Sequence, residues 1–308
     1  MNSPIALFLY NRPKHAMHTI AALQLCIESK ESDLFIFIDG HKSQASQTEL
    51  QQIKDVKKYS HSVNAFKTVQ IIEQNENIGL SKSITKGISH VLQSHKNVIV
   101  LEDDIIVGQD FLSFMNLALK KYENDPKVAG ISGYSFPINE PQPFFSRTGS
   151  CWGWATYKRV WDDFLIKRNE LNLSLISNNE MSLFNVYNNV YSNMFLQNKQ
   201  GVIQSWAVEF YLYYFSKKYF FLMPGLNLVA NEGFDGSGAH KKRGNFLTDN
   251  NPIRNLSKIN FPHHVVEEKH IRKKIQKLYE QGFSKPSFII SFVNKIKSVL
   301  LGNENNNH

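Results

Sequence analysis

The chain has 308 residues, of which 42% are hydrophobic, and carries 35 Lys and Arg against 27 Asp and Glu. This composition excludes a disordered or fibrous chain and suffices for a large buried core. The only cysteines, Cys26 and Cys151, exclude a disulfide framework and a thiolate metal site, as is typical of a reducing cytoplasm. The apolar run Ile5 to Tyr10 is too short for a signal-peptide core, and no run approaches the ~18 apolar residues that span a bilayer. We therefore expect a cytoplasmic protein.

Short apolar runs of strand length alternate with longer amphipathic segments in the first part of the chain. The runs are Ile5 to Tyr10, Leu34 to Asp39, Thr68 to Ile72, Val98 to Glu102 and Val128 to Ser132. Such alternation predicts an α/β fold with a mostly parallel sheet flanked by helices. Further along, the aromatic residues between Tyr211 and Phe221 have helical spacing, which predicts a core-facing helix leading into a strand.

Charged side chains stand where three of these strands end. Arg12 follows the first strand, Asp39 ends the second, and Glu102, Asp103 and Asp104 end the fourth. Since α/β proteins bind ligands at the carboxyl edge of the sheet, we expect Arg12, Asp39 and Asp104 to share one crevice. Three adjacent carboxylates repel one another, and hard oxygen ligands favour Mg2+ or Mn2+. The alternative is a solvated acidic turn that caps the following helix.

Several motifs in a fixed order resemble those of nucleotide-sugar-dependent glycosyltransferases with the GT-A (Rossmann-like) fold. They are Ile-Ala-Leu-Phe-Leu-Tyr-Asn-Arg-Pro at 5–13, Phe-Ile-Asp-Gly at 37–40, Glu76 to Ser83, Leu-Glu-Asp-Asp at 101–104, Ser150 to Ala155, and Asn231 to His240. The sequence is most similar to the N-acetylglucosaminyltransferase I-like branch and its bacterial surface-polysaccharide (family 2-type) relatives. The resemblance covers residues 3–241.

This resemblance implies roles for the charged residues at the strand ends. Asp104, the last acid of the triplet, would coordinate the metal that bridges the donor diphosphate. Asp103 and Glu102 would lie beside the ribose and the water shell of the metal. Arg12 and Asp39 would hold the nucleotide, with Asp39 facing the base.

The segment from Asn77 to Lys86 resembles the part of the family that lies against the nucleotide sugar. Asn77 would contact the donor, and Gly79 would supply a tight turn or a close backbone approach. Lys82 and Arg12 could stabilise the charge that develops on the departing diphosphate. Lys82 could equally be a solvated residue in the first turn of a helix.

An inverting transferase also needs a base that takes the proton of the acceptor hydroxyl. Family members place an acid shortly after a tryptophan in the region that matches Trp206, and this chain departs from that pattern because the residue immediately after Trp206 is Ala207. Glu209 is the first candidate for the base and Asp235 the second. His240 could contact the metal or a phosphate, or be a solvated residue beside other basic side chains.

The tryptophans are candidate sugar contacts. Trp152, Trp154 and Trp161 lie within ten positions, and aromatic faces suit the apolar faces of sugar rings. With Gly153 between them, Trp152 and Trp154 would share one strand and one face. We expect Trp152, Trp154 and Trp206 to contact the acceptor or the transferred sugar, whereas core packing is the alternative for at least one tryptophan.

The excess positive charge lies at the end of the chain. Residues 1–240 hold 22 basic and 22 acidic residues and residues 241–308 hold 13 and 5, so 13 − 5 gives the whole net charge of +8. Residues 242–264 are expected to form a loop, and residues 286–300 a basic amphipathic helix. That helix could lie on the anionic inner face of a cell membrane or pack on the catalytic domain. No known DNA- or RNA-binding module accompanies the charge.

The sequence thus predicts a GT-A catalytic domain over 1–241, with a nucleotide-sugar half at about 1–107 and an acceptor half at about 108–241. Residues 242–308 would form a loop and a basic helical tail. The predicted activity is metal-dependent, inverting transfer of a sugar from a UDP-type donor to a surface glycan, such as a lipid-linked oligosaccharide. The alternatives are a nucleotide-sugar nucleotidyltransferase and a catalytically degenerate relative that binds sugar or membrane.

Overall fold

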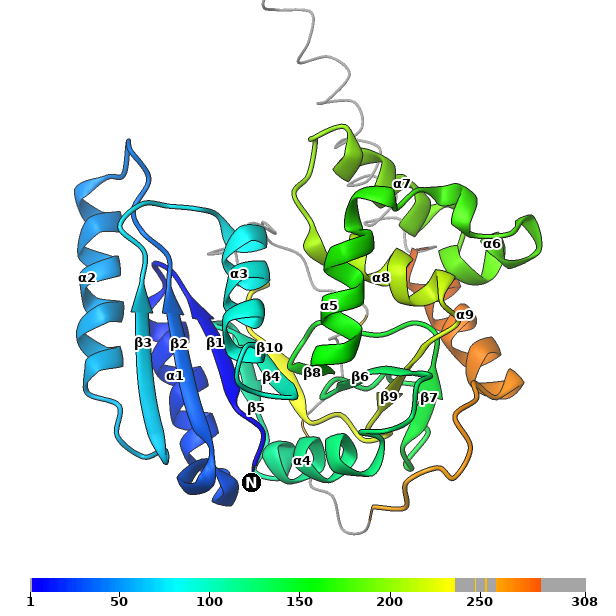
Figure 1. The fold of residues 1–308 in the computed structure, drawn as a ribbon, viewed down its shortest axis with the longest axis horizontal. Coiled ribbons are helices and arrows are strands. Elements are labelled where there is room, and N and C mark those ends of the chain that lie inside the picture. The colour runs from blue at the N-terminus through cyan, green and yellow to red at the C-terminus, as the bar shows by residue number, and fades with distance from the viewer. Residues whose placement is uncertain (1, 236–246, 248–252, 254–258, 284–308) are drawn as a thin grey trace, which may run out of the picture.

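The computed structural model describes residues 2–235, 247, 253 and 259–283 (Figure 1). A central eight-stranded sheet runs through this part of the molecule in the order β3-β2-β1-β4-β8-β6-β9-β7, and β10 pairs with β5 in a small second sheet. Helices flank the sheet, and α5 to α8 gather on one side of the view over β6 and β8. The fold is therefore α/β with a large central sheet, as predicted.

The strands are β1 Ile5–Leu9, β2 Asp33–Ile38, β3 Thr68–Glu73, β4 Asn97–Glu102, β5 Ile105–Val107, β6 Val128–Ser132, β7 Phe144–Ser146, β8 Trp154–Tyr157, β9 Phe220–Met223 and β10 Val229–Asn231. The α-helices are α1 Pro13–Gln24, α2 Gln47–His61, α3 Leu80–Leu92, α4 Phe111–Lys121, α5 Lys158–Lys167, α6 Asn178–Asn185, α7 Val190–Lys199, α8 Trp206–Ser216 and α9 Lys269–Phe283. Short 3-10 turns occupy Ile27–Glu31, Arg168–Glu170 and Leu173–Leu175.

The first half of the sheet is parallel and the second half is mixed. Strands β3, β2, β1 and β4 pair in parallel, so their carboxyl ends lie at one edge, and all five predicted strands are confirmed. Beyond β4 the ladder is antiparallel at β4–β8, β6–β8 and β7–β9. The sequence did not reveal these pairs, because the strands involved are only three to six residues long.

Local sequence explains where several helices begin. Pro13 opens α1, a position at which the missing N–H costs no helical hydrogen bond. Ser46 caps α2 by accepting a hydrogen bond from the backbone N–H of Glu49, and Ser205 caps α8 in the same way through Val208. Helix α8 buries nine of its eleven residues, which confirms the prediction of a core-facing aromatic helix leading into β9.

Aromatic rings form the core between α5, α8 and β8. Trp154 is 1% exposed and stacks on Trp206, with ring centroids 5.1 Å apart and planes 20° apart. Trp161 is fully buried against Phe164 and Phe210. Its indole N–H donates to the hydroxyl of Ser89 at 3.1 Å, which joins α5 to α3.

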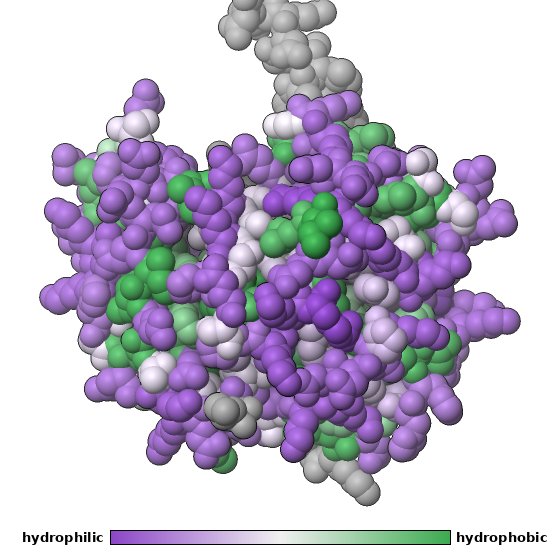
Figure 2. All heavy atoms as spheres, in the orientation of Figure 1, coloured by the Kyte–Doolittle hydropathy of each residue, from purple (hydrophilic) through white to green (hydrophobic). Residues whose placement is uncertain are grey.

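Helix α9 packs against the rest of the described fold. Its buried residues include Ile271, Ile275 and Tyr279, and Arg272 donates to Glu267 at 2.8 Å with both side chains 8% exposed. The predicted domain end at residue 241, most of the predicted loop and the predicted helix at 286–300 lie outside the described residues. In the part of the chain that the structure describes, no helix is long and apolar enough to cross a membrane. Figure 2 shows polar side chains over most of one face, interrupted by separate apolar patches.

Replacement of the buried ring that joins α5 to α3 should be costly. Trp161→Ala should lower the free energy of unfolding by about 3–5 kcal/mol, because it leaves a cavity and removes the hydrogen bond that the Ser89 hydroxyl accepts. Ile166→Ala on the same helix should change it by less than about 0.5 kcal/mol, since Ile166 is 75% exposed. Urea unfolding of both variants measures this difference, and equal effects would contradict the packing described.

Candidate functional site

An arginine between two aspartates marks the carboxyl edge of the parallel strands. Arg12 lies in the loop after β1, and Asp103 and Asp104 directly follow the adjacent strand β4. Its Nε donates to Asp103 Oδ2 at 3.1 Å, and its Nη2 donates to Asp103 Oδ1 and, at 2.9 Å, to Asp104 Oδ2. Of the three residues expected to share one crevice, the structure thus brings Arg12 and Asp104 into contact.

The acid triplet carries more negative charge than Arg12 balances. Burial raises the pKa of Asp103, and the hydrogen bond from Arg12 opposes that rise. Burial, and then the charges of Asp104 and Asp103, raise the pKa of Glu102 to about 8. Since three carboxyl groups face a single guanidinium, the cluster favours an additional cation or proton.

Arg12 also has one unused donor. Its Nη1 is buried and has no hydrogen-bond partner among the described residues, while the side chain as a whole is 18% exposed. A buried N–H without a partner costs on the order of 1–3 kcal/mol. An anionic oxygen placed there, such as that of a phosphate, would satisfy the donor with a charge-assisted hydrogen bond.

The described residues fit a divalent metal through Asp104 with most of its coordination supplied by a ligand. No group of three or more His, Cys, Asp or Glu side chains among the described residues is arranged to hold an ion alone. Mg2+ commonly binds through one or two carboxylates and completes its shell with phosphate oxygens and water. The two aspartates beside a single arginine, with Glu102 adjacent, fit this arrangement. His240, the other suggested metal contact, lies outside the described residues.

Asp39 holds the loop that follows β3. Its Oδ1 accepts from the backbone N–H groups of Gly40 and Ile78, both at 2.9 Å, and its Oδ2 accepts from the side chain of Asn77 and the backbone N–H of Gly79, both at 3.0 Å. These four hydrogen bonds fill the acceptor capacity of a carboxylate. Asp39 and Asn77 therefore hold the loop at the edge of the sheet. The Asp39 carboxylate and the Asn77 amide are both engaged in hydrogen bonds within the protein, so neither group is wholly available to a ligand.

Gly79 has the turn role that the sequence suggested. It caps α3 with φ 80° and ψ 152°, a conformation that is essentially restricted to glycine. A Cβ at this position would meet nothing within 4 Å, so glycine is required for its backbone conformation and not for lack of space. Lys82 is exposed in the first turn of α3, which agrees with the solvated alternative.

The segment after β10 covers Asp104. The backbone N–H of Glu232 donates to the carbonyl of Asp104 at 2.9 Å. Gly233 approaches so closely that a Cβ there would lie 2.2 Å from Asp104 Oδ2. Asp235 follows, with its Oδ2 3.2 Å from the Nε2 of His15 on α1. This second candidate base therefore lies in a segment that touches the acid triplet.

Glu209, the first candidate base, is held elsewhere. Its Oε2 accepts from Nε of Arg168 at 2.6 Å, and its Oε1 accepts from the side chain of Asn198 at 3.1 Å. It does not line the aromatic cavity next to α8, whereas its neighbours Ala207 and Val208 do. The structure thus places Asp235, and not Glu209, in a segment that contacts Asp104.

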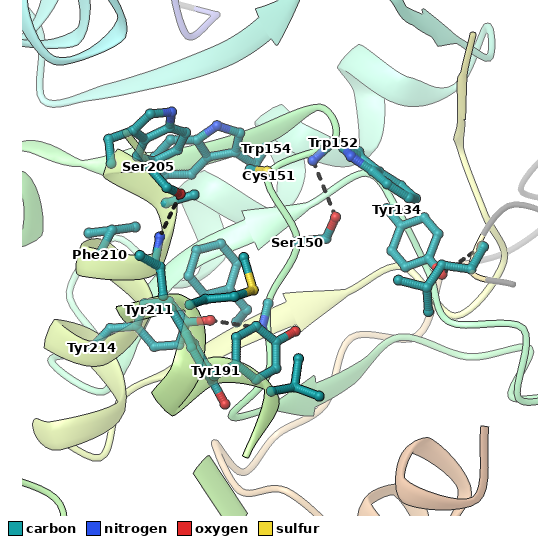
Figure 3. A pocket seen from close by; sticks show the side chains of 18 of the residues that line it. Tyr134, Ser150, Cys151, Trp152, Trp154, Tyr191, Ser205, Phe210, Tyr211 and Tyr214 are labelled. Atoms are coloured by element: carbon teal, nitrogen blue, oxygen red, sulfur yellow. Dashed lines mark hydrogen bonds between the residues drawn. The ribbon is translucent and has the colours of Figure 1, made fainter. Parts of the chain in front are cut away.

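All three tryptophans suggested as sugar contacts line a cavity of about 450 Å3 (Figure 3). Trp154 and Trp206 form part of its buried wall, whereas Trp152 is less buried and packs edge-on against Tyr134. The prediction that Trp152 and Trp154 share a strand is wrong, because Gly153 has φ 58° and β8 begins at Trp154. Both rings nevertheless face the same cavity.

Sequence reasoning missed two residues near the acid triplet. His15 reaches Asp235 from α1, although these residues are 220 positions apart, and no local pattern reports such a contact. Cys151 lines the aromatic cavity, and its burial, together with the charges of Glu102 and Asp104, raises the pKa of its thiol to about 12. Its position beside the two tryptophans of the motif 150–155 was the available signal.

The fold and the edge site define an α/β protein with a cluster of charged side chains at the carboxyl ends of β1 and β4. No protein-family model matches the sequence, and no curated protein matches it. Similar solved structures include the mannosyltransferase PcManGT from Pyrobaculum calidifontis in complex with GDP-Man and Mn2+, at 11% identity and a TM-score of 0.35, covering 54% of this chain and 47% of that one. S. aureus TarS gives 13% identity and a TM-score of 0.36, covering 52% of this chain and 29% of that one, and TarS 1–349 gives 13% and 0.35, covering 52% and 48%. The alignments span less than half of each of those chains, and likeness at this level identifies neither a family nor an activity.

Loss of the Asp39 carboxylate should loosen the loop at 77–79. In Asp39→Asn, the amide N–H2 faces backbone donors, so we expect a loss of about 1–3 kcal/mol in the free energy of unfolding. Asp55→Asn, on the exposed face of α2, is the control and should stay within about 0.5 kcal/mol. Urea denaturation compares the two variants. An unchanged Asp39→Asn would show that the four hydrogen bonds contribute little.

Proposed function

We propose that this protein is a nucleotide-sugar-dependent glycosyltransferase that uses a divalent metal, with inversion at the transferred sugar. The donor in this proposal is a UDP-sugar, and the acceptor is a surface glycan such as a lipid-linked oligosaccharide. The nucleotide choice rests on the sequence resemblance and not on geometry. The diphosphate site rests on the charged groups at the ends of β1 and β4.

The observation that carries the proposal is the environment of Arg12. Its guanidinium is held by Asp103 and Asp104 but retains a buried Nη1 that has no partner among the described residues. A diphosphate oxygen would meet this donor, and its negative charge would sit beside acids that require a cation. A donor diphosphate and a metal together therefore supply what the site lacks, whereas either one alone would leave a charge unbalanced.

The chemistry follows from these positions. The acceptor hydroxyl oxygen forms a bond to the anomeric carbon, and the bond from that carbon to the diphosphate oxygen breaks with its electron pair on the diphosphate. Arg12 stabilises that charge as it develops. Mn2+ or Mg2+ held through Asp104 supplies further charge stabilisation when bound. Asp39 keeps the loop at 77–79 in place without needing to touch the donor.

The proton of the acceptor hydroxyl goes to Asp235 in this proposal. Asp235 lies in the segment that contacts Asp104, its side chain is 48% exposed, and His15 orients it at 3.2 Å. Glu209 is a weaker candidate because Arg168 and Asn198 occupy its carboxylate. The pairing of Glu209 with Arg168 and Asn198, together with alanine at 207, supports a second candidate function. In that case the protein is a catalytically degenerate relative that binds a nucleotide sugar without transferring it.

Nucleotide binding should depend on Asp104. UDP with Mn2+ at 100 times the dissociation constant should stabilise the protein by about 2.7 kcal/mol, seen as a rise in the melting temperature, and Asp104→Asn should abolish the metal-dependent part. Asp55→Asn should retain the full shift. A panel of UDP-, GDP- and TDP-sugars, each with and without Mn2+, measures this by thermal shift, with nucleoside triphosphates included. Stabilisation by triphosphates alone would support a nucleotidyltransferase instead.

Asp235 and Glu209 can be separated by a single comparison. Asp235→Asn should reduce donor turnover by about 10²–10⁴-fold while leaving UDP binding intact, because a positioned base contributes about that factor. Glu209→Gln should instead lower the free energy of unfolding by about 1–3 kcal/mol through the weakened Arg168 pair. Hydrolysis of UDP-sugars and urea unfolding give the two readouts. Loss of turnover in Glu209→Gln alone would restore Glu209 as the base.

A further inference from the structure

The aromatic cavity beside the acid triplet has a chemistry of its own. It has a volume of about 450 Å3, and among the described residues no charged side chain lines it. We infer that this cavity binds an apolar aglycone of the acceptor, an alkyl or aryl group joined to the sugar or hydroxyl that receives the transferred residue. The role of the bound group as part of an acceptor rests on the proposed function, whereas its binding to the cavity does not.

Each hydroxyl group of the cavity already makes a hydrogen bond with the protein. Tyr211 donates to the carbonyl of Phe184 at 2.7 Å, Tyr134 donates to the carbonyl of Leu247 at 2.8 Å, and Tyr191 shares a hydrogen bond with Tyr279 at 2.8 Å. The two serines on its wall and the hydroxyl of Tyr214 each accept a hydrogen bond from a backbone N–H. Figure 3 shows the labelled rings together with the hydrogen bonds that Ser150 and Ser205 accept.

A sugar ring inside this cavity would lose the water that hydrogen-bonds its hydroxyls and would meet few replacements. Sites that select hydroxylated ligands present matching donors and acceptors, and a buried hydroxyl without a partner costs on the order of 1–3 kcal/mol. An alkyl or aryl group loses no hydrogen bond on entry and gains contact with aromatic faces. The cavity therefore fits the part of a glycoside that is not sugar.

The cavity adjoins the acid triplet. Trp152 on its wall packs edge-on against Phe234 with ring centroids 5.9 Å apart, and Phe234 follows Gly233, which touches Asp104. Cys151 is also on the wall, and after burial the charges of Glu102 and Asp104 contribute to the raised pKa of its thiol. An acceptor whose apolar group fills the cavity would thus direct its polar end toward Asp104 and Asp235.

Ala207 keeps one side of the cavity apolar. The residue is half-buried, lines the cavity and directly follows the buried Trp206. A carboxylate here would point into the aromatic space, and desolvation would oppose its charge. The methyl group leaves the cavity open and uncharged.

A homologous series of glycosides tests the inference without any turnover. Methyl, butyl, hexyl and octyl β-D-glucopyranoside, each below its micelle concentration, and phenyl β-D-glucopyranoside would be titrated against the intrinsic fluorescence, since three of the four tryptophans line the cavity. Affinity should rise up to about fourfold for each methylene that enters, and glucose should not bind. The phenyl arm distinguishes an aryl from an alkyl preference. An affinity that does not change with chain length would overturn the inference.

Two variants localise the binding. Ala207→Leu should fill part of the cavity, weaken binding of the octyl glycoside at least tenfold and so flatten the dependence of affinity on chain length. Ala21→Leu, on the exposed face of α1, should leave that dependence unchanged. If Ala207→Leu does not fold, Met194→Glu places a charge at the rim, where Met194 is 36% exposed, and should weaken octyl binding similarly. Binding that resists both a folded Ala207→Leu and Met194→Glu lies elsewhere and overturns the assignment.

The two hypotheses fail independently. Asp104→Asn should lose the UDP and Mn2+ thermal shift but retain the chain-length dependence, and Ala207→Leu should do the reverse. If the wild-type protein binds no nucleotide yet binds octyl glucoside with the expected slope, the proposed transferase function fails and the apolar site stands. If nucleotide binding is present and the slope is absent, the proposed function stands and the apolar site fails.

Discussion

The ion pair between Arg12 and Asp103 is the interaction on which the arrangement of the site depends. It joins the loop after β1 to the end of β4, and two parallel N–H···O contacts fix the guanidinium plane. Asp104 is thereby drawn to the same arginine, and Gly233 closes over its carboxylate. Replacement of either partner would leave a largely buried charge unpaired, which destabilises a protein far more than loss of an exposed pair.

Arg12 alone cannot neutralise the acids Glu102, Asp103 and Asp104 beside it. This charge imbalance indicates which ligands the site would favour. Burial raises the pKa values of Glu102 and Asp103, so the folded protein holds these carboxyls at a cost that a bound cation would relieve. At the same place one arginine N–H remains buried without a partner in the described structure. The site therefore favours an anion and a cation bound side by side.

The sequence predicted the strands at the parallel half and the residues at their ends, because buried parallel strands are continuous apolar runs and their carboxyl ends meet by geometry. It could not predict that the Asp39 carboxylate is occupied by hydrogen bonds that hold the loop at 77–79. That result depends on the positions of four backbone and side-chain donors, which only the folded structure gives. It also favoured Glu209 over Asp235. Only the fold shows that Arg168 occupies the former and that His15 reaches the latter.

The β4–β8 ladder has a consequence for motion. Four consecutive residue pairs, from Asn97 with Tyr157 to Val100 with Trp154, connect the strands that carry the acid triplet to those that carry the aromatic wall. Hinge bending between these two regions would have to break that ladder. The distance between the charged edge and the aromatic cavity is therefore held by the backbone hydrogen bonds between β4 and β8.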